Sequence, residues 1–403
     1  MMLGYLLARA GVQVTVLEKH ADFLRDFRGD TVHPSTLAIL DQCGLKNKFD
    51  TLPQSKVQEA SVHIGKKHFR IADFRGLNPF DYIALVPQWD FLDLLASEGQ
   101  KLNNFNLLMS TEATDVIREP APSDQEVVSS KVVGVVANTP NGTLEIRADL
   151  VVGCDGRRST VRSTLGLKVL DLGAPMDVLW FKLPREKSDD GGLTAVLGAG
   201  DMMIMINRNT YYQAAYIVPK GSDSTIRKLP ISELHQRIVK LRPFLKDRCS
   251  AIGSWDDVKT LVVTIDRLEQ WCEPGALVIG DAAHAMSPVG GVGINLAIQD
   301  AVAAANIITA AIGNAEPLTT EVLARVQKRR QRPTERIQRL QMLAQDRVVS
   351  AALEAKNELP KLPVVLRFMI GFKWFRKIPA RVIGYGFNRE RVECLGKTNV
   401  PTS

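Results

Sequence analysis

The sequence predicts an α/β fold whose parallel sheet is interrupted by an inserted antiparallel sheet. Two observations predict it. Short apolar segments followed by glycine or an acidic residue occur beside helical patterns, first at 12–18 and again at 151–153 and 276–279. Between about 175 and 265 the pattern is strand-rich instead, in VLWFKLP, TAVLGAG, MMIMINR and YYQAAYIVP. Because the two patterns alternate along the chain, we expect two interleaved domains rather than two in series.

Apolar spacing and terminal glycine or proline residues define the individual elements. A helix at Leu3–Ala10 stops at Gly11, and an alternating strand, GVQVTVLE, ends in Glu18. Helices are then expected at Pro34–Cys43 and Asp90–Lys101, and strands at Ser61–Ala72, Tyr82–Val86, Leu107–Arg118, Lys131–Thr139 and Leu144–Val152. After a helix at Ile231–Leu241 and a buried strand at Ala276–Ile279, a glycine-rich loop leads into an alanine-rich helix, and a basic helix follows at Leu323–Leu353.

Length and composition exclude several classes of protein. Of the 403 residues, 45% are hydrophobic and 24% charged, which suits a large core and argues against a disordered chain. No run of 18 apolar residues occurs, so a transmembrane helix is not expected. The cysteines are odd in number and far apart, which argues against a metal site or a disulfide framework and favours a reducing, cytoplasmic location. They are Cys43, Cys154, Cys249, Cys272 and Cys394.

The basic residues are concentrated late in the chain. Residues 325–403 contain 18 Lys and Arg against 6 Asp and Glu, whereas the whole chain has 51 against 44. The tail lacks the interleaved aromatic and basic residues of single-strand binding, so we expect a solvated helix face and no nucleic-acid partner. The tract Val364–Lys377 suits an interfacial helix or a helix packed over a substrate pocket. We favour the second interpretation and do not expect membrane association.

Two segments place polar groups at the carboxyl ends of expected strands, where α/β folds bind ligands. Glu18 has the position at which a dinucleotide-binding unit holds a ribose, although by itself a plain helix–strand unit explains it more simply. The segment VVGCDGRRSTVR carries Asp155, Gly156 and Arg162 at a strand–turn–helix corner. That corner either approaches a cofactor or merely connects two elements.

The third segment, LVIGDAAHAMSPVGGVGINLAIQDA at 277–301, carries the strongest indication. A buried strand ends at Asp281, whose carboxylate can accept hydrogen bonds from a polyol. The glycines at 290, 291 and 293 leave bare backbone on which a flat ring can lie. They lead into a helix N-terminus, which attracts negative charge. An ordinary glycine-rich connection explains this order of residues poorly.

These segments resemble the group A flavoprotein monooxygenases, the para-hydroxybenzoate hydroxylase-like family of FAD enzymes. The resemblance extends over nearly the whole chain, and its specific carriers are Asp155-Gly156 with Ser159 and Arg162, and the segment 277–301. It implies a Rossmann-like FAD-binding domain interleaved with an antiparallel β-sheet substrate domain. The FAD-binding domain would comprise 1–60, 89–170 and 266–325, the substrate domain 61–88 and 171–265, and a basic helical region 326–403.

The resemblance also implies roles for individual residues. Glu18 would bind the adenosine ribose, and Asp281 would hold the ribityl chain. Arg28 would approach the ribose and pyrophosphate, unless it is a surface ion-pair partner, and Gln88 would contact the flavin chain, unless it caps a loop. Ala113 would offer backbone to the adenine. The isoalloxazine would be lined by Pro288, Gly290, Gly291, Gly293, Ile294 and Asn295, with Asp155, Gly156, Arg162 and Gly280 as further cofactor contacts.

Side chains that contact the substrate are harder to assign. The candidates in the strand-rich middle are Trp180, Phe181, Met203, Met205, Tyr211 and Tyr216, and for each of them a place in the core is the simpler interpretation. His284 lies inside the third segment and is expected to be structural rather than a base. No histidine has a surrounding motif that indicates a catalytic base.

The activity implied by the resemblance is hydroxylation of a small aromatic or polyketide-like substrate. NADPH or NADH would reduce FAD, and reaction with O2 would give a C4a-hydroperoxyflavin that transfers one oxygen atom while the protein excludes water. The GxGxxG turn of the family, which supplies amides to the pyrophosphate, is not in this sequence. A mis-assigned start or a truncated relative explains this difference, and we expect weak FAD binding or poor folding without the turn. A dehydrogenase or oxidase on the same fold, or a flavin-free remnant, remain alternatives.

Overall fold

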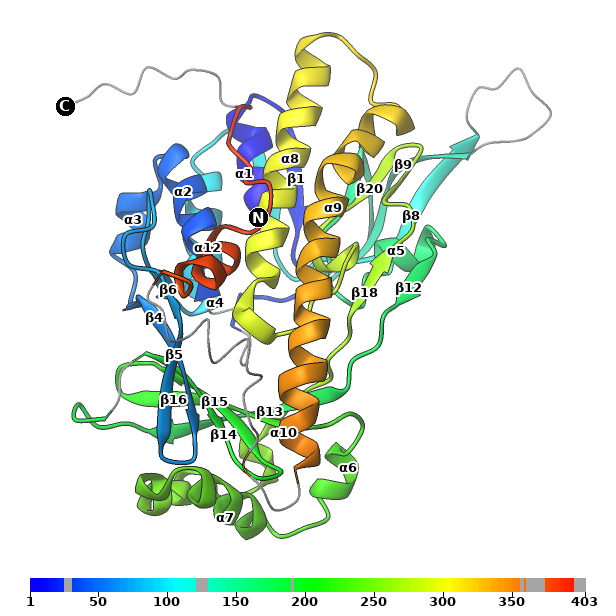
Figure 1. Ribbon diagram of the computed structural model, residues 1–403. Helices are drawn as coiled ribbons and strands as arrows, with labels where there is room; N and C mark the ends of the chain where they lie inside the picture. Colours follow the sequence, from blue (N-terminus) through cyan, green and yellow to red (C-terminus); the bar gives the residue numbers. More distant parts are fainter. Residues whose placement is uncertain (25–30, 121–129, 190–191, 356–358, 360–373, 395–403) are drawn as a thin grey trace.

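The computed structural model describes residues 1–24, 31–120, 130–189, 192–355, 359 and 374–394. In the view of Figure 1, most helices and several small sheets occupy the upper part of the molecule, and a seven-stranded sheet occupies the lower part. The long helix α9 (Thr320–Ala344) runs from the upper part to the lower one (Figure 1). The predicted combination of parallel strands with an antiparallel sheet is therefore confirmed.

Two parallel strand pairs form the centre of the upper part. β1 pairs with β7, and β11 pairs with β20. Within the described ranges the two pairs belong to separate sheets, and the antiparallel strands β8, β9 and β10 form a third. The strands are β1 (Val14–Leu17), β7 (Phe105–Leu108), β8 (Glu112–Pro120), β9 (Ser130–Thr139), β10 (Gly142–Arg147), β11 (Val151–Gly153), β12 (Val169–Asp171), β18 (Asp266–Leu268), β19 (Cys272–Glu273) and β20 (Ala276–Val278).

Helices enclose these strands around the largest hydrophobic core. α1 packs against α8, on which Ala301, Ala304 and Ala305 are buried and small enough for close approach. The stretch Val289–Gly313 is long and apolar enough to cross a membrane, but 67% of its most apolar window is buried inside the protein, as in a core helix. The other helices here are α1 (Met2–Arg9), α2 (Pro34–Gln42), α3 (Lys46–Asp50), α4 (Gln88–Gly99), α5 (Thr160–Thr164), α8 (Gly293–Gly313) and α12 (Lys377–Tyr385).

The seven-stranded sheet has the order β17-β13-β16-β15-β14-β4-β5. Successive side chains point to opposite faces. One face of the sheet, called here the closed face, is covered by α7. On it Phe181, Met203 and Tyr216 are buried. On the inner face, Trp180 and Ile204 remain partly accessible. The elements are β4 (Glu59–Ile64), β5 (Lys67–Asp73), β13 (Met176–Pro184), β14 (Leu193–Leu197), β15 (Met202–Asn207), β16 (Tyr211–Pro219), β17 (Lys259–Leu261), α6 (Asp223–Ile226) and α7 (Ile231–Leu241).

Several expected elements have different bounds in the structure. The strand expected at Leu107–Arg118 is two strands, β7 and β8, because the chain turns at Ser110 with a φ of 52°. The strand expected at Leu144–Val152 likewise divides into β10 and β11, and the one expected at Ser61–Ala72 is the β4–β5 hairpin. A three-stranded sheet of β2 (Thr31–Val32), β6 (Ile83–Leu85) and β3 (Ser55–Val57) completes the fold. The domain boundaries stay a prediction.

Candidate functional site

The end of β20 presents Asp281 to solvent from an otherwise buried turn. The chain leaves the buried strand at Gly280, whose φ of 62° lies in the region that favours glycine. In the following 3₁₀ turn, η3 (Gly280–Ala282), the flanking Gly280 and Ala282 are buried, whereas the Asp281 side chain is 40% exposed. The Arg157 guanidinium lies 3.9 Å from the Asp281 carboxylate. The turn thus holds an accessible carboxylate at the carboxyl end of a parallel strand, the usual ligand position in α/β folds.

Two hydrogen bonds fix the backbone on either side of Asp281. The Gly280 N–H donates to Asp300 Oδ2 at 3.1 Å. Arg162 Nη1 donates to the Ala282 carbonyl at 3.4 Å. Since both neighbours are anchored, the direction in which the Asp281 side chain leaves the turn is fixed by residues from α8 and α5.

Asp300 is the centre of a buried polar cluster. Its carboxylate contacts His284 Nε2 at 2.5 Å and accepts a hydrogen bond from Arg330 Nε at 2.9 Å. Arg330 Nη1 in turn donates to Glu390 Oε1 at 3.3 Å. The side chains of His284, Asp300, Arg330 and Glu390 are 1%, 0%, 0% and 2% exposed. His284 therefore has the structural place that was expected of it.

The electrostatics of this cluster keep Asp300 ionised. Burial alone would raise the pKa of the Asp300 carboxyl, because burial penalises the charged form. The charges and hydrogen bonds of His284 and Arg330 outweigh burial, so the pKa of Asp300 is lowered from its ordinary value. Such buried charges are stable only while they remain paired.

The glycine-rich loop that follows is packed tightly on one side. Gly291 has a φ of 62°, and a Cβ at this position would lie 2.4 Å from Thr31 Oγ1. Thr31 Oγ1 also donates a hydrogen bond to the Gly291 carbonyl at 2.8 Å. Gly290 is exposed, and Gly293 and Ile294 are half-buried. The loop therefore leans against β2 on one side and leaves bare backbone accessible at the N-terminus of α8 on the other.

The side chain of Asn295 is engaged in hydrogen bonds within the protein, and its expected contact with the ring stays a prediction. Its Oδ1 accepts hydrogen bonds from the His33 N–H and from Thr36 Oγ1, both at 2.8 Å. Its Nδ2 donates to the Thr31 carbonyl at 3.1 Å and to the Gly291 carbonyl at 3.2 Å. The Asn295 side chain is thus committed to tying α8 to the start of α2 and to the glycine loop, and only its backbone is left for a cofactor.

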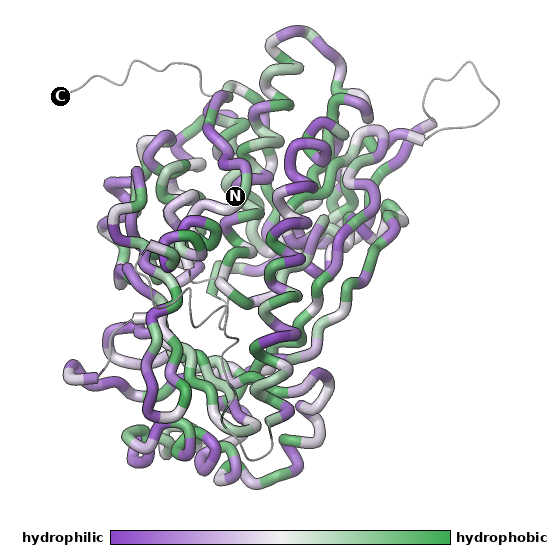
Figure 2. The backbone as a smooth tube through the Cα atoms, viewed as in Figure 1, coloured by the Kyte–Doolittle hydropathy of each residue, from purple (hydrophilic) through white to green (hydrophobic). Residues whose placement is uncertain are grey.

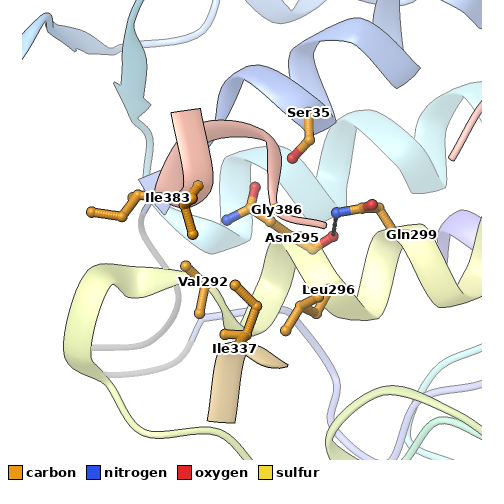
Figure 3. Close-up of a pocket in the computed structure, with 9 residues that line it drawn as sticks. Ser35, Val292, Asn295, Leu296, Gln299, Ile337, Ile383 and Gly386 are labelled. Carbon is orange, nitrogen blue, oxygen red and sulfur yellow. Dashed lines mark hydrogen bonds between the residues drawn. The ribbon is translucent and has the colours of Figure 1, made fainter. Parts of the chain in front are cut away.

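A cavity of about 10 Å³ lies behind this loop, on the side of α12 (Figure 3). Figure 3 shows Asn295 and Gln299 of α8 near Ser35 and Gly386, which also line the cavity. The cavity is large enough for a single water molecule and too small for a substrate. The cavity is therefore a small packing gap behind the glycine-rich loop and not a substrate site.

The second predicted segment forms a helix cap rather than an open anion site. Ser159 Oγ donates to Asp155 Oδ1 at 2.5 Å, and the Val161 N–H donates to Asp155 Oδ2 at 3.1 Å. Arg162 pairs with Asp266 at 3.3 Å and donates to the Arg157 carbonyl at 2.6 Å. These bonds join α5 to β18 and to η3. Arg162 acts on the site through the Ala282 carbonyl, and Gly156 turns the chain with a φ of 84°.

The remaining predicted cofactor residues lie around the ends of β1 and β8. Glu18 is half-buried at the end of β1, and its Oε1 accepts a hydrogen bond from the His20 N–H at 3.0 Å. The Thr111 N–H donates to the Glu18 carbonyl at 2.9 Å, which brings the start of β8, and Ala113 on it, beside β1. Gln88 is half-buried at the first position of α4. Arg28 and most of the tract 364–377 lie outside the described residues.

Three members of the buried cluster, Asp300, Arg330 and Glu390, were not singled out from the sequence. The basic tail was expected to form a solvated helix face, and α9 is largely hydrophilic along its length (Figure 2). That expectation is wrong for Arg330, which is fully buried between Asp300 and Glu390. The partners lie 30 and 60 residues away in sequence, so no local pattern marks Arg330 or Glu390. Asp300, by contrast, lies in the segment 277–301, which the sequence singled out, although no role was assigned to Asp300 itself.

The inner face of the sheet meets the glycine-rich loop. Trp180 and Ile204 belong to the same apolar cluster as Val289 of that loop and Met342 of α9. The cluster places a partly accessible apolar surface next to the glycine-rich loop, which follows the Asp281 turn in the chain. Among the substrate candidates of the sequence, Phe181, Met203, Met205 and Tyr216 are core residues of the closed face, as the simpler interpretation expected. Over the described residues, no group of three or more His, Cys, Asp or Glu is placed to hold a metal ion.

Comparison with known proteins identifies the family. The family model described as FAD binding domain matches residues 1–339. A 6-methylpretetramide 4-monooxygenase of Streptomyces rimosus is 28% identical over 376 residues, which cover 90% of this chain and 85% of that protein. The structure of PqsL from Pseudomonas aeruginosa in complex with 2-aminobenzoylacetate has a TM-score of 0.74 at 20% identity and covers 88% of this chain and 94% of that one. That of p-nitrophenol 4-monooxygenase PnpA from Pseudomonas putida DLL-E4 has a TM-score of 0.73 at 19% identity, covering 95% and 92%. The chain therefore belongs to the FAD-binding-domain family, the FAD-dependent, para-hydroxybenzoate hydroxylase-like monooxygenases.

Proposed function

We propose that this chain is an NAD(P)H-dependent hydroxylase that uses FAD and O2 to add one oxygen atom to a small aromatic or polyketide-like compound. The observation that carries the proposal is the arrangement around Asp281. An accessible carboxylate, bare glycine backbone and a helix N-terminus lie together, facing an apolar surface of the sheet. FAD, when bound, supplies the reduction by nicotinamide and the activation of O2.

The residues around Asp281 fit the ribityl chain and ring of FAD. A polyol needs hydrogen-bond acceptors, and the Asp281 carboxylate is exposed while its neighbours are buried. A flat ring needs backbone without side chains, and a Cβ on Gly293 would lie 3.8 Å from Asp281 Oδ1, in the same space. Glu18 at the end of β1 fits a ribose, as a carboxylate at this position does in dinucleotide-binding folds.

The task of the protein residues is positioning and exclusion of water. Asp281 orients the ribityl chain, and the α8 N-terminus stabilises negative charge at the ring edge. Gly290 and Gly293 allow the ring to lie against backbone. The apolar inner face with Trp180 and Ile204 excludes water from the opposite side and favours a flat apolar substrate. No described residue is assigned as a catalytic base.

The chemistry of the relatives supports the substrate class. Among the proteins similar to this chain are a 6-methylpretetramide 4-monooxygenase and a p-nitrophenol 4-monooxygenase, and the compounds that these names specify contain aromatic rings. The apolar inner face suits such rings better than a charged metabolite. We also propose a cytoplasmic location, which the five free cysteines support because free thiols suit a reducing compartment.

The test is a screen of the purified, FAD-reconstituted chain against phenolic and polyketide compounds, with NADPH and NADH compared. Substrate-dependent consumption of nicotinamide and O2 is expected, together with a product heavier by one oxygen atom. A product that has lost two hydrogens without gaining oxygen would instead indicate a dehydrogenase or oxidase. Absence of any bound flavin after reconstitution would refute the proposal and favour the flavin-free remnant.

A further inference from the structure

Residues 388–394, called here the C-terminal segment, contact the helices α8 and α2. These two helices also hold the glycine-rich loop at 288–293, called here the flavin loop. Asn306 of α8 holds it through three backbone contacts: Nδ2 donates to the Arg391 carbonyl at 2.8 Å, and Oδ1 accepts from the N–H groups of Glu393 and Cys394 at 2.9 and 3.0 Å. Gln42 Oε1 accepts from the Val392 N–H at 2.8 Å. These bonds alone seat the segment on α8 and α2.

Glu390 adds a buried charge to this seat. Its side chain is 2% exposed and pairs with Arg329 at 2.6 Å and with Arg330 at 3.3 Å. Removing a carboxylate from water carries a large desolvation penalty, and a well-packed apolar residue anchors a segment at lower cost. Besides its contacts with the partly exposed Arg329, the carboxylate fixes the position of the fully buried Arg330 guanidinium, which an apolar residue could not do.

The Arg330 guanidinium connects Glu390, through Asp300, to the backbone of the turn that carries Asp281. It is planar, so its two ends move together. Its Nη1 is held by Glu390 and by the Asn388 carbonyl, each at 3.3 Å, and its Nε holds Asp300 Oδ1 at 2.9 Å. The other oxygen of Asp300 accepts the Gly280 N–H at 3.1 Å, one residue before Asp281. A continuous chain of buried polar contacts thus joins the C-terminal segment to the backbone that directs Asp281.

We propose that Glu390 is a positioning residue of the flavin site, which acts through Arg330 and Asp300 on the direction of the Asp281 side chain. The inference rests on the proposed placement of the ribityl chain at Asp281. It gives the C-terminal segment a role in cofactor binding although no atom of that segment is assigned to contact FAD.

The test compares Glu390→Gln with Glu393→Gln, which alters a 66% exposed carboxylate of the same segment. The FAD dissociation constant is measured by quenching of flavin fluorescence, and the thermal unfolding of the flavin-free chain is followed in parallel. Glu390→Gln is expected to weaken FAD binding about tenfold, as the loss of an outer partner of a ligand does. Glu393→Gln is expected to bind FAD as the unmodified chain does.

A double-variant cycle with Asp281→Asn separates positioning from general loss of stability. If Glu390 acts through Asp281, Glu390→Gln weakens FAD binding much less in the Asp281→Asn background than in the unmodified chain. Equal weakening in both backgrounds, or unchanged binding by Glu390→Gln, overturns the inference. Should Glu390→Gln not fold, Glu390→Asp, which keeps the charge but shortens its reach, is tested in the same cycle with the same expectation. If Asp281→Asn alone leaves FAD binding unchanged, the placement of FAD itself is wrong, which is a distinct outcome.

Discussion

Replacement of Asp300 by asparagine is expected to lower the free energy of unfolding by about 3–5 kcal/mol, the effect of breaking a buried ion pair. Asp300 is fully buried, and its two oxygens face Gly280 N–H, His284 Nε2 and Arg330 Nε. An asparagine amide has one acceptor oxygen, so at least one of these donors is left without an acceptor, at about 1–3 kcal/mol. The fully buried Arg330 also loses one of its two counter-charges, which accounts for the rest.

The assay is urea unfolding of the flavin-free chain at neutral pH, because bound cofactor would add its own stabilisation. Tryptophan fluorescence reports on the region directly, since the Trp271 ring lies 5.1 Å from the His284 ring. Glu316→Gln is the control: this carboxylate is 34% exposed, pairs with Arg325 at 2.6 Å, and is expected to contribute no more than about 1 kcal/mol. Equal effects of the two substitutions would refute the reasoning that burial makes the Asp300 pairs essential.

Three further outcomes follow from the geometry. Asp281→Asn is expected to weaken FAD binding about tenfold in a fluorescence titration while the flavin-free chain unfolds unchanged, because its side chain is 40% exposed; a large loss of stability would contradict this. Gly291→Ala is expected to destabilise the chain by more than about 1 kcal/mol in thermal unfolding, since its φ is 62° and its Cβ would meet Thr31 Oγ1 at 2.4 Å; a neutral effect would show that the loop relaxes. Burial alone would raise the pKa of Asp177, but the hydrogen bond and charge of Lys220 and the N–H groups of Gly221 and Val263 lower it below its ordinary value. The stability that Asp177 contributes is therefore present above its unfolded pKa and is lost as the pH falls through its folded pKa. In an acid titration, Asp177→Asn is expected to reduce the dependence of the free energy of unfolding on pH below about pH 4.

Local sequence patterns predicted elements whose bounds depend on near neighbours. The helix expected at Ile231–Leu241 has those bounds in α7, because its apolar residues recur at helical spacing. The turn at Ser110, in contrast, has neither glycine nor proline to mark it, so β7 and β8 were expected as one strand.

The same distinction applies to the candidate site. Asp281 could be identified from its own segment, because a carboxylate at a strand end followed by glycines is a local signal. The contacts of Asn295 with Thr31 and His33 span more than 260 residues, and those of Arg330 with Glu390 span 60. Only the folded chain brings these partners together, and so the support of the site was not predictable.

Successive side chains of β15 point to opposite faces of the sheet, so substitutions at neighbouring positions affect different surfaces. Met203 and Met205 face the core under α7, whereas Ile204 between them faces the flavin loop. If the substrate ring binds at this face, as we propose, a new side chain at Ile204 would alter the shape offered to the ring and leave the packing beneath the sheet in place. Directed evolution of substrate preference should therefore randomise Ile204 and the other β15 positions on its face, and leave Met203 and Met205 unchanged.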